Sequence, residues 1–242
     1  RGNGNATILK RMYNSTSASS GPTAMGLITL NQKSGCKIQS LQIDGNKTSY
    51  TNSNNSGICL YGSMYNTVTG NTCNNNYYSI YLNSSSNNTV TGNTCNNNSY
   101  DGIDLSTSSN NTVTGNTCNN NGIGIYLYLS SINTITGNTC SNNNNYSIYL
   151  ASSNNNNTIT GNTCNNNNKY GIFLSESSNN TVTGNTCNDN VSGISLALSS
   201  NNNTVTGNTC NNNNKYGIYA NSSRNNTVTG NTCIRGTGQT SD

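Results

Sequence analysis

"NNTVTGNTCNNN", residues 87–98, is the stretch that decides the fold, because close variants of it recur along most of the chain. Each copy contains Gly-Asn-Thr-Cys, and successive copies place their cysteines 22 to 24 residues apart. A fixed period of this length is typical of solenoids, in which a repeat buries its apolar side chains only by stacking on its neighbours. The cysteines that mark the period are Cys73, Cys95, Cys118, Cys140, Cys164, Cys187, Cys210 and Cys233.

Within each repeat, apolar and polar residues alternate in two short stretches. Ile80 and Leu82 would share one face of a strand, and Val90 would point away from the threonines on either side of it. Cys95 offers a third inward position after a Gly-Asn turn, and the intervening Asn, Ser and Gly residues favour further turns. Three short strands and three turns in about 23 residues predict one turn, or rung, of a parallel β-helix.

We therefore expect an all-β chain that forms a single parallel β-helix of about ten rungs. The regular coil should cover residues 26–233, since Ile28, Leu30, Ile38 and Ile43 repeat the inward register, with Ile43 in the cysteine position. Residues 1–25 should form an irregular first coil, and residues 234–242 a tail. At about 4.8 Å per rung, the rod would be about 50 Å long.

The composition excludes several classes of function. Only 7% of the residues are charged, the net charge is +4 and the basic residues form no run, so we expect no nucleic-acid partner. No apolar stretch approaches the roughly 20 residues needed to span a bilayer. Ten cysteines and many Asn-x-Ser/Thr triplets in a polar chain indicate an oxidising, extracellular setting. The triplets are also potential glycan acceptors.

The asparagine of each Gly-Asn-Thr-Cys unit should stack on its equivalents, each amide bonding to the next. We interpret this asparagine ladder as structural rather than as a binding site. Its members are Asn71, Asn93, Asn116, Asn138, Asn162, Asn185, Asn208 and Asn231.

The eight repeat cysteines form one inward column with three possible roles. Pairs on adjacent rungs, such as Cys73 with Cys95, would be close enough for disulfides that each contribute about 3 kcal/mol. The thiols could instead stay reduced as small buried apolar groups, or bind a soft metal as thiolates. We predict no bound metal or cofactor. Cys36 and Cys59 lie off the column, so they are either lone thiols or sites of disulfides between subunits.

Two outward stripes offer surfaces for contact. One is aromatic and is a potential lateral interface or sugar-stacking surface, unless its rings only stack on one another; it comprises Tyr78, Tyr81, Tyr126, Tyr146, Tyr149, Tyr170, Phe173, Tyr216 and Tyr219. The other is the Thr-x-Thr pair of each rung, exemplified by Thr89 and Thr91, which is similar to the ice-binding face of β-helical antifreeze proteins. Strand propensity alone also explains those threonines.

The acidic residues do not suggest an active site. They are Asp44, Asp101, Asp104, Glu176, Asp189 and Asp242, and the repeat register places most of them on different rungs and faces. Only Asp101 and Asp104 are near each other, and we expect them to flank the start of a strand. Paired carboxylates across a sugar are therefore not expected, and the absence of His excludes the common nucleophilic triads. These observations predict a protein that is not an enzyme.

Units of the form Asn-Thr-Val-x-x-Asn-Thr-Ile, followed by Gly-Ile-x-Leu, resemble the right-handed parallel β-helix repeats of pectate-lyase-like and periplasmic copper-binding-type proteins. The resemblance covers residues 26–233 and implies a right-handed β-helix with three short strands per rung. The chain departs from that pattern by carrying Cys where Ile is usual. A cysteine-bearing, Asn-rich version is most similar to the sheath or surface-layer proteins of methanogenic archaea, whose coats are hardened by disulfides.

The sequence therefore predicts a structural extracellular protein of a cell wall or sheath, whose main partner is itself. Assembly would use end-to-end stacking of β-helices, because neither end shows a recognisable cap, together with tyrosine-lined lateral contacts and disulfides. The alternative is a surface protein that binds ice through its Thr-x-Thr face or binds carbohydrate.

Overall fold

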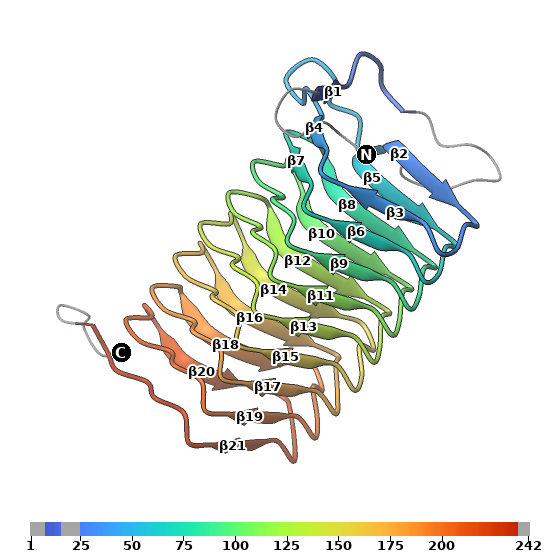
Figure 1. Ribbon diagram of the computed structural model, residues 1–242. Coiled ribbons are helices and arrows are strands. Elements are labelled where there is room, and N and C mark those ends of the chain that lie inside the picture. The colour runs from blue at the N-terminus through green and yellow to red at the C-terminus, as the bar shows by residue number, and fades with distance from the viewer. Residues whose placement is uncertain (1–7, 16–24, 237–242) are drawn as a thin grey trace.

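The computed structural model describes residues 8–15 and 25–236, in which the chain winds as a right-handed coil of parallel strands (Figure 1). The first face is a nine-stranded sheet in which each strand pairs with its equivalent in the next rung. Its strands are β2 (Met25–Asn31), β5 (Asn55–Tyr61), β8 (Tyr78–Asn83), β10 (Asp101–Ser106), β12 (Ile123–Tyr128), β14 (Tyr146–Ala151), β16 (Tyr170–Ser175), β18 (Ser192–Ala197) and β20 (Tyr216–Ala220).

The second face is another nine-stranded sheet, built from three-residue strands. These are β3 (Lys37–Gln39), β6 (Thr67–Thr69), β9 (Thr89–Thr91), β11 (Thr112–Thr114), β13 (Thr134–Thr136), β15 (Thr158–Thr160), β17 (Thr181–Thr183), β19 (Thr204–Thr206) and β21 (Thr227–Thr229). A Thr-Val-Thr or Thr-Ile-Thr motif thus supplies one complete strand of every rung from β6 onward, whereas β3 reads Lys-Ile-Gln.

The third face has regular strands only near the N-terminal end, namely β1 (Ile8–Lys10), β4 (Gln42–Asp44) and β7 (Thr72–Asn74). Beyond β7 it continues as single bridges between threonines, such as Thr94 with Thr117. The predicted all-β parallel β-helix is confirmed, with two corrections. Nine strands stack in each main face, so ten rungs was slightly too many, and the third strand is usually one residue long.

Polar turns close each rung. Gly92, Asn87 and Asn97 have φ values of 61°, 58° and 58°, and equivalent residues recur down the rod. Glycine and asparagine tolerate this left-handed region better than other residues do. The repeated Gly-Asn and Asn-Asn pairs of the sequence are therefore the corners of the coil.

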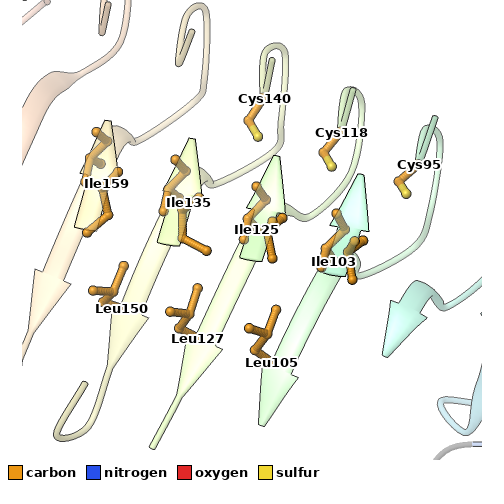
Figure 2. Close-up of a cluster of buried hydrophobic side chains, with 14 of the residues drawn as sticks. Cys95, Ile103, Leu105, Cys118, Ile125, Leu127, Ile135, Cys140, Leu150 and Ile159 are labelled. Carbon is orange, nitrogen blue, oxygen red and sulfur yellow. The ribbon is translucent and has the colours of Figure 1, made fainter. Parts of the chain in front are cut away.

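The core is a narrow column of side chains from all three faces (Figure 2). Ile103 and Leu105 of β10, Val113 of β11 and Cys118 of the third face are each fully buried. Because equivalent residues pack above and below them, every rung completes the core of its neighbours. The continuous core runs from Ile38 to Cys210.

The predicted boundaries at both ends fall partly on residues that the structure does not describe, which are 1–7, 16–24 and 237–242. In the described residues 8–15 of the expected first coil, β1 pairs with β4, so Ile8–Lys10 adds a strand to the third face. No helix in the described ranges has the length and apolar character needed to cross a bilayer.

Candidate functional site on the aromatic face

The asparagines of the Gly-Asn-Thr-Cys units stack in one buried column. Asn93 Nδ2 donates to Asn116 Oδ1 at 3.0 Å and to the Val68 carbonyl at 2.9 Å, while the Asn93 backbone N–H donates to Asn116 Oδ1 at 2.9 Å. Equivalent bonds continue along the rod through Asn71, Asn138, Asn162, Asn185, Asn208 and Asn231. The side-chain amides of this column are therefore hydrogen-bonded to backbone groups and to one another.

Two further asparagine ladders were missed by the sequence interpretation. One begins Asn66, Asn88, Asn111, and the other begins Asn76, Asn98, Asn121; each Oδ1 accepts from the backbone N–H of the preceding rung. Their signal was present as the asparagine before each Thr-Val-Thr and the third residue after each repeat cysteine. Three ladders thus stabilise the three corners of the coil.

The repeat cysteines stack beside a column of small residues on the first face. A Cβ added to Gly102 would lie 2.9 Å from Cys118 Cβ, so glycine makes room for the thiol. All ten cysteines lie in the described ranges, where no two are joined by a disulfide. Burial raises the pKa of the Cys118 and Cys187 thiols well above the ordinary value, so both are protonated at neutral pH.

The structure separates the two off-column cysteines from the column and from each other. Cys36 is half-buried, and its Sγ lies 3.6 Å from the Ser34 carbonyl. Cys59 was expected to face outward, and it does leave the core, but neighbouring tyrosines cover it completely. Burial raises the pKa of its thiol to about 12. The expectation that Cys59 is available for a bond between subunits is therefore corrected.

The aromatic residues form a strip on the outside of the first face. Tyr149 and Phe173 stack with centroids 5.0 Å apart, Tyr126 lies 5.3 Å from Tyr149, and Tyr146 lies 5.6 Å from Tyr170. The rings cover one another, so exposure varies from 6% at Tyr81 to 46% at Tyr216. The remaining members, Tyr78 and Tyr219, stack on Tyr81 and Tyr216.

Two acids interrupt this strip on β10, and we call Asp101 and Asp104 the acid pair. Asp104 lies in register between Tyr81 and Tyr126 on the flanking strands. Asp101 is 0% exposed and Asp104 3% exposed. The sequence interpretation expected these two residues to flank the start of a strand, and it did not foresee that tyrosines from adjacent rungs would cover them.

The acid pair is strongly perturbed. Burial raises the pKa of Asp104 to about 7, although the Ser106 hydroxyl, which donates to Asp104 Oδ1 at 2.8 Å, lowers it. Burial, and then the charge of Asp104, raise the pKa of Asp101 well above its ordinary value. A side-chain hydrogen bond between the two carboxyls raises the pKa of Asp101 further and lowers that of Asp104.

The Thr-x-Thr face lies on the second sheet, away from the acid pair. Its threonines are in register from β6 to β21, and most are half-buried. Thr160 Oγ1 and Thr183 Oγ1 donate to the carbonyls of Thr183 and Thr206, each at 2.9 Å. These hydroxyls therefore contact the next rung, which favours a structural role for them.

These features define a right-handed parallel β-helix with an acid pair set into an aromatic outer face. The chain belongs to the family described as "Periplasmic copper-binding protein (NosD)", which residues 12–169 match. Residues 129–233 also match the "Right handed beta helix region" family. No curated protein gave a match. Neither family model is one of archaeal sheath proteins, so the expected resemblance to them is not shown.

Several solved structures share the fold. A periplasmic alginate epimerase, AlgG, has a TM-score of 0.68 at 19% identity, covering 84% of this chain and 60% of its own. The Dettilon tailspike protein has a TM-score of 0.69 at 17% identity, covering 94% and 56%. An alginate lyase from Paenibacillus has a TM-score of 0.63 at 14% identity, covering 96% and 93%. The chain thus spans less than two thirds of the epimerase and of the tailspike.

These neighbours contradict the sequence prediction that the chain is not an enzyme. An epimerase and a lyase have this architecture, so a β-helix of this kind is compatible with catalysis. At 14% to 19% identity the likeness shows the fold alone, and no activity follows from it.

The described residues do not fit the copper site that the family description implies. The sequence contains no His, and within residues 8–15 and 25–236 no three Cys, Asp or Glu residues are grouped as metal ligands. Thiolates are the form of cysteine that binds copper, whereas burial keeps Cys118 and Cys187 protonated.

Proposed function

We propose that this chain binds polysaccharide along its aromatic face, in the cell envelope or outside the cell. The observation that carries the proposal is the strip of rings on β12, β14 and β16, in which neighbouring centroids lie 5.0 to 5.6 Å apart. Tyrosine combines an apolar ring with a hydroxyl, which suits the C–H faces and hydroxyls of sugar rings. Fold similarity to an alginate epimerase and an alginate lyase supports this class of ligand.

Binding is tested by calorimetry with a panel of neutral and uronic-acid oligosaccharides. The informative variant combines Tyr170→Ser with Phe173→Ser, because Ser192 and Ser195 occupy these positions on β18. The fold already accepts serine there, so we expect the variant to fold and to bind at least about tenfold more weakly, a loss of about 1.4 kcal/mol.

The matched control combines Thr158→Ser with Thr160→Ser on the second sheet and should bind as the wild type does. The proposal is wrong if no oligosaccharide binds, or if the aromatic double variant retains wild-type affinity.

We also propose, as a second function, that the chain assembles with copies of itself into a sheath, surface layer or filament. The observation in favour is an apolar corner after β12, where Tyr128, Leu129 and Ile132 are 40%, 44% and 56% exposed. Ile132 has a φ of 59°, and the same position in the two adjacent rungs is an asparagine, Asn110 or Asn156. A β-branched residue is disfavoured in this conformation. A contact with another chain would offset that cost.

Assembly is tested by negative-stain microscopy of the wild type and of Ile132→Asn with Leu129→Ser, which copies Asn156 and Ser152 of the next rung. We expect lateral arrays from the wild type and dispersed rods from the variant. The variant should also be more stable by about 1 kcal/mol, because strain is relieved. Dispersed wild-type rods, or arrays from both proteins, would contradict the proposal. Non-reducing electrophoresis shows whether Cys36 links the chains.

A further inference from the structure

The turns that lead from the first face to the second carry exposed apolar side chains at regular intervals. Tyr65 and Ile132 occupy the same position of this turn, three rungs apart, because each lies two residues before a strand of the second sheet. Leu129 and Leu198 share another position, directly after β12 and β18, which are also three rungs apart. Together with Met64 these residues form what we call the apolar ridge. Its three clusters are spaced by about 14 Å, three times the distance of about 4.8 Å between neighbouring strands.

The ridge residues are exposed, and most of them are in a disfavoured conformation. Met64, Tyr65 and Leu198 are 44%, 66% and 57% exposed. Tyr65 and Leu198 have φ values of 57° and 51°, whereas another rung has Asn87 and Ser84 at these two positions. Bulky side chains are disfavoured in this left-handed region. Strain at exposed apolar residues indicates a contact that offsets its cost.

Even spacing makes the ridge self-complementary. A two-fold axis can place the ridges of two copies against each other with the rods either parallel or antiparallel. In a parallel pair every cluster meets its own equivalent. In an antiparallel pair the central cluster of Leu129 and Ile132 meets itself, and Tyr65 meets Leu198 of the second copy. The outer clusters are equally far from the central one, so all three are in contact in either arrangement.

Charge favours the antiparallel arrangement. Glu176 is the only charged residue in the turns from the first face to the second between Gly62 and Asn203, all of which the structure describes. A parallel pair would place it against Glu176 of the second copy, and like charges that face each other are destabilising. In an antiparallel pair it faces the turn of Asn87 in the second copy, whose amide can donate a hydrogen bond to the carboxylate.

We propose that two copies of this chain pair antiparallel along the apolar ridge. This pairing rests on the proposed self-assembly, and it adds the partner surface and its orientation. Lys33 and Arg224 lie in the turns just beyond the two outer clusters. An antiparallel pair brings Lys33 to the turn of Arg224 in the second copy, whereas a parallel pair brings each of these residues to its own equivalent.

Sedimentation velocity at a series of concentrations tests the orientation. Arg224→Glu places a carboxylate opposite Lys33 of the second copy in an antiparallel pair, so we expect the dimer to tighten at least about threefold. In a parallel pair the same change replaces one like-charge contact by another, and the affinity should not rise. Lys215→Glu, directly before β20 at another corner, changes the net charge equally and is the matched control. It should leave the affinity unchanged.

A double-mutant cycle gives a second readout. Tyr65→Asn and Leu198→Ser copy Asn87 and Ser84, so both variants should fold, and each should weaken the dimer at least about threefold. Because the two residues meet across an antiparallel interface, the double variant should lose less affinity than the product of the two single losses.

Two results would overturn the antiparallel ridge: independent effects of Tyr65→Asn and Leu198→Ser, or an Arg224→Glu dimer that is no tighter than the wild type. The proposed self-assembly would survive either result if the variant of Leu129 and Ile132 still disperses the arrays. Wild-type protein that stays monomeric at every concentration would overturn both.

Discussion

Asn93 illustrates how a chain with so few apolar residues holds a fold. Its side chain donates to the Val68 and Thr91 carbonyls and to Asn116 Oδ1, so one residue satisfies several buried backbone groups at a corner. Backbone groups left without partners inside the rod would each cost free energy comparable to a lost hydrogen bond. The ladders therefore satisfy the backbone hydrogen-bonding groups at the corners, as strand pairing does on the faces.

Replacing one ladder asparagine should lower the stability of the fold substantially. Asn116→Ala removes the acceptor of the Asn93 backbone N–H and the donor to the Val90 carbonyl, both buried. We expect the free energy of unfolding, measured by urea denaturation, to fall by about 3 kcal/mol. Asn168→Ala, at an exposed asparagine, should cost less than about 0.5 kcal/mol. Similar losses in the two variants would contradict the proposed role of the ladder.

The acid pair predicts an unusual dependence of stability on pH. The pKa of Asp104 is raised from 3.8 to about 7, so between these values the folded state binds a proton that the unfolded state has lost. The contribution of Asp104 to the free energy of unfolding should therefore fall by about 4 kcal/mol as pH rises from about 4 to about 7. Asp101 acts in the same direction.

Denaturation of the wild type and of Asp104→Asn across this pH range checks the prediction. The variant should show a shallower slope, because only Asp101 still binds an extra proton in the folded state, whereas Asp189→Asn should retain the wild-type slope. A wild-type stability that rises with pH over the same window would show that the acid pair is ionised in the folded protein.

Alternation in the sequence predicted the strands of two faces well, because Val90 and its flanking threonines, or Ile80 and Leu82, leave little choice of register. The third strand of each rung was overestimated, since the turns at Gly92 and Asn97 leave only Thr94 in a bridge to the next rung. The repeat register also placed Cys59 off the column and Asp104 close to Asp101, as the structure has them. Their burial escaped prediction, because the tyrosines that cover them come from rungs about 22 residues away in sequence.

Thiol labelling tests how the cysteine column is packed. Cys36 is half-buried and Cys233 exposed, whereas Cys95, Cys118 and Cys140 are fully buried. After mild reduction, N-ethylmaleimide should modify Cys36 and Cys233 first. Buried column members such as Cys118 and Cys187 should react only once the protein unfolds, because thiolates are the reactive form and burial raises the pKa of these thiols. Peptide mass spectrometry locates the labels. Early labelling of Cys118 in native protein would show that the column is open to solvent.

Stacking of near-identical rungs along the rod makes its stability nearly additive. Each rung contributes its own folding free energy and its contacts with two neighbours, and it makes few contacts beyond them. The fold therefore depends on continuity of the stack rather than on any single rung, and the acid pair of β10 and the apolar corner after β12 are local changes that the regular repeats tolerate.

Deleting one complete rung tests this directly. Removing residues 134–157 joins Asn133 to Thr158, which already pairs with Thr134, so β11 would pair with β15 in the same register. We expect cooperative unfolding with a modestly lower denaturation midpoint. The transition is measured by circular dichroism in guanidinium chloride. Removing residues 134–145 instead places a first-face strand where a second-face strand belongs and moves inward side chains out of register. That shorter deletion should be the more damaging one, and equal stability of the two proteins would contradict the additive picture.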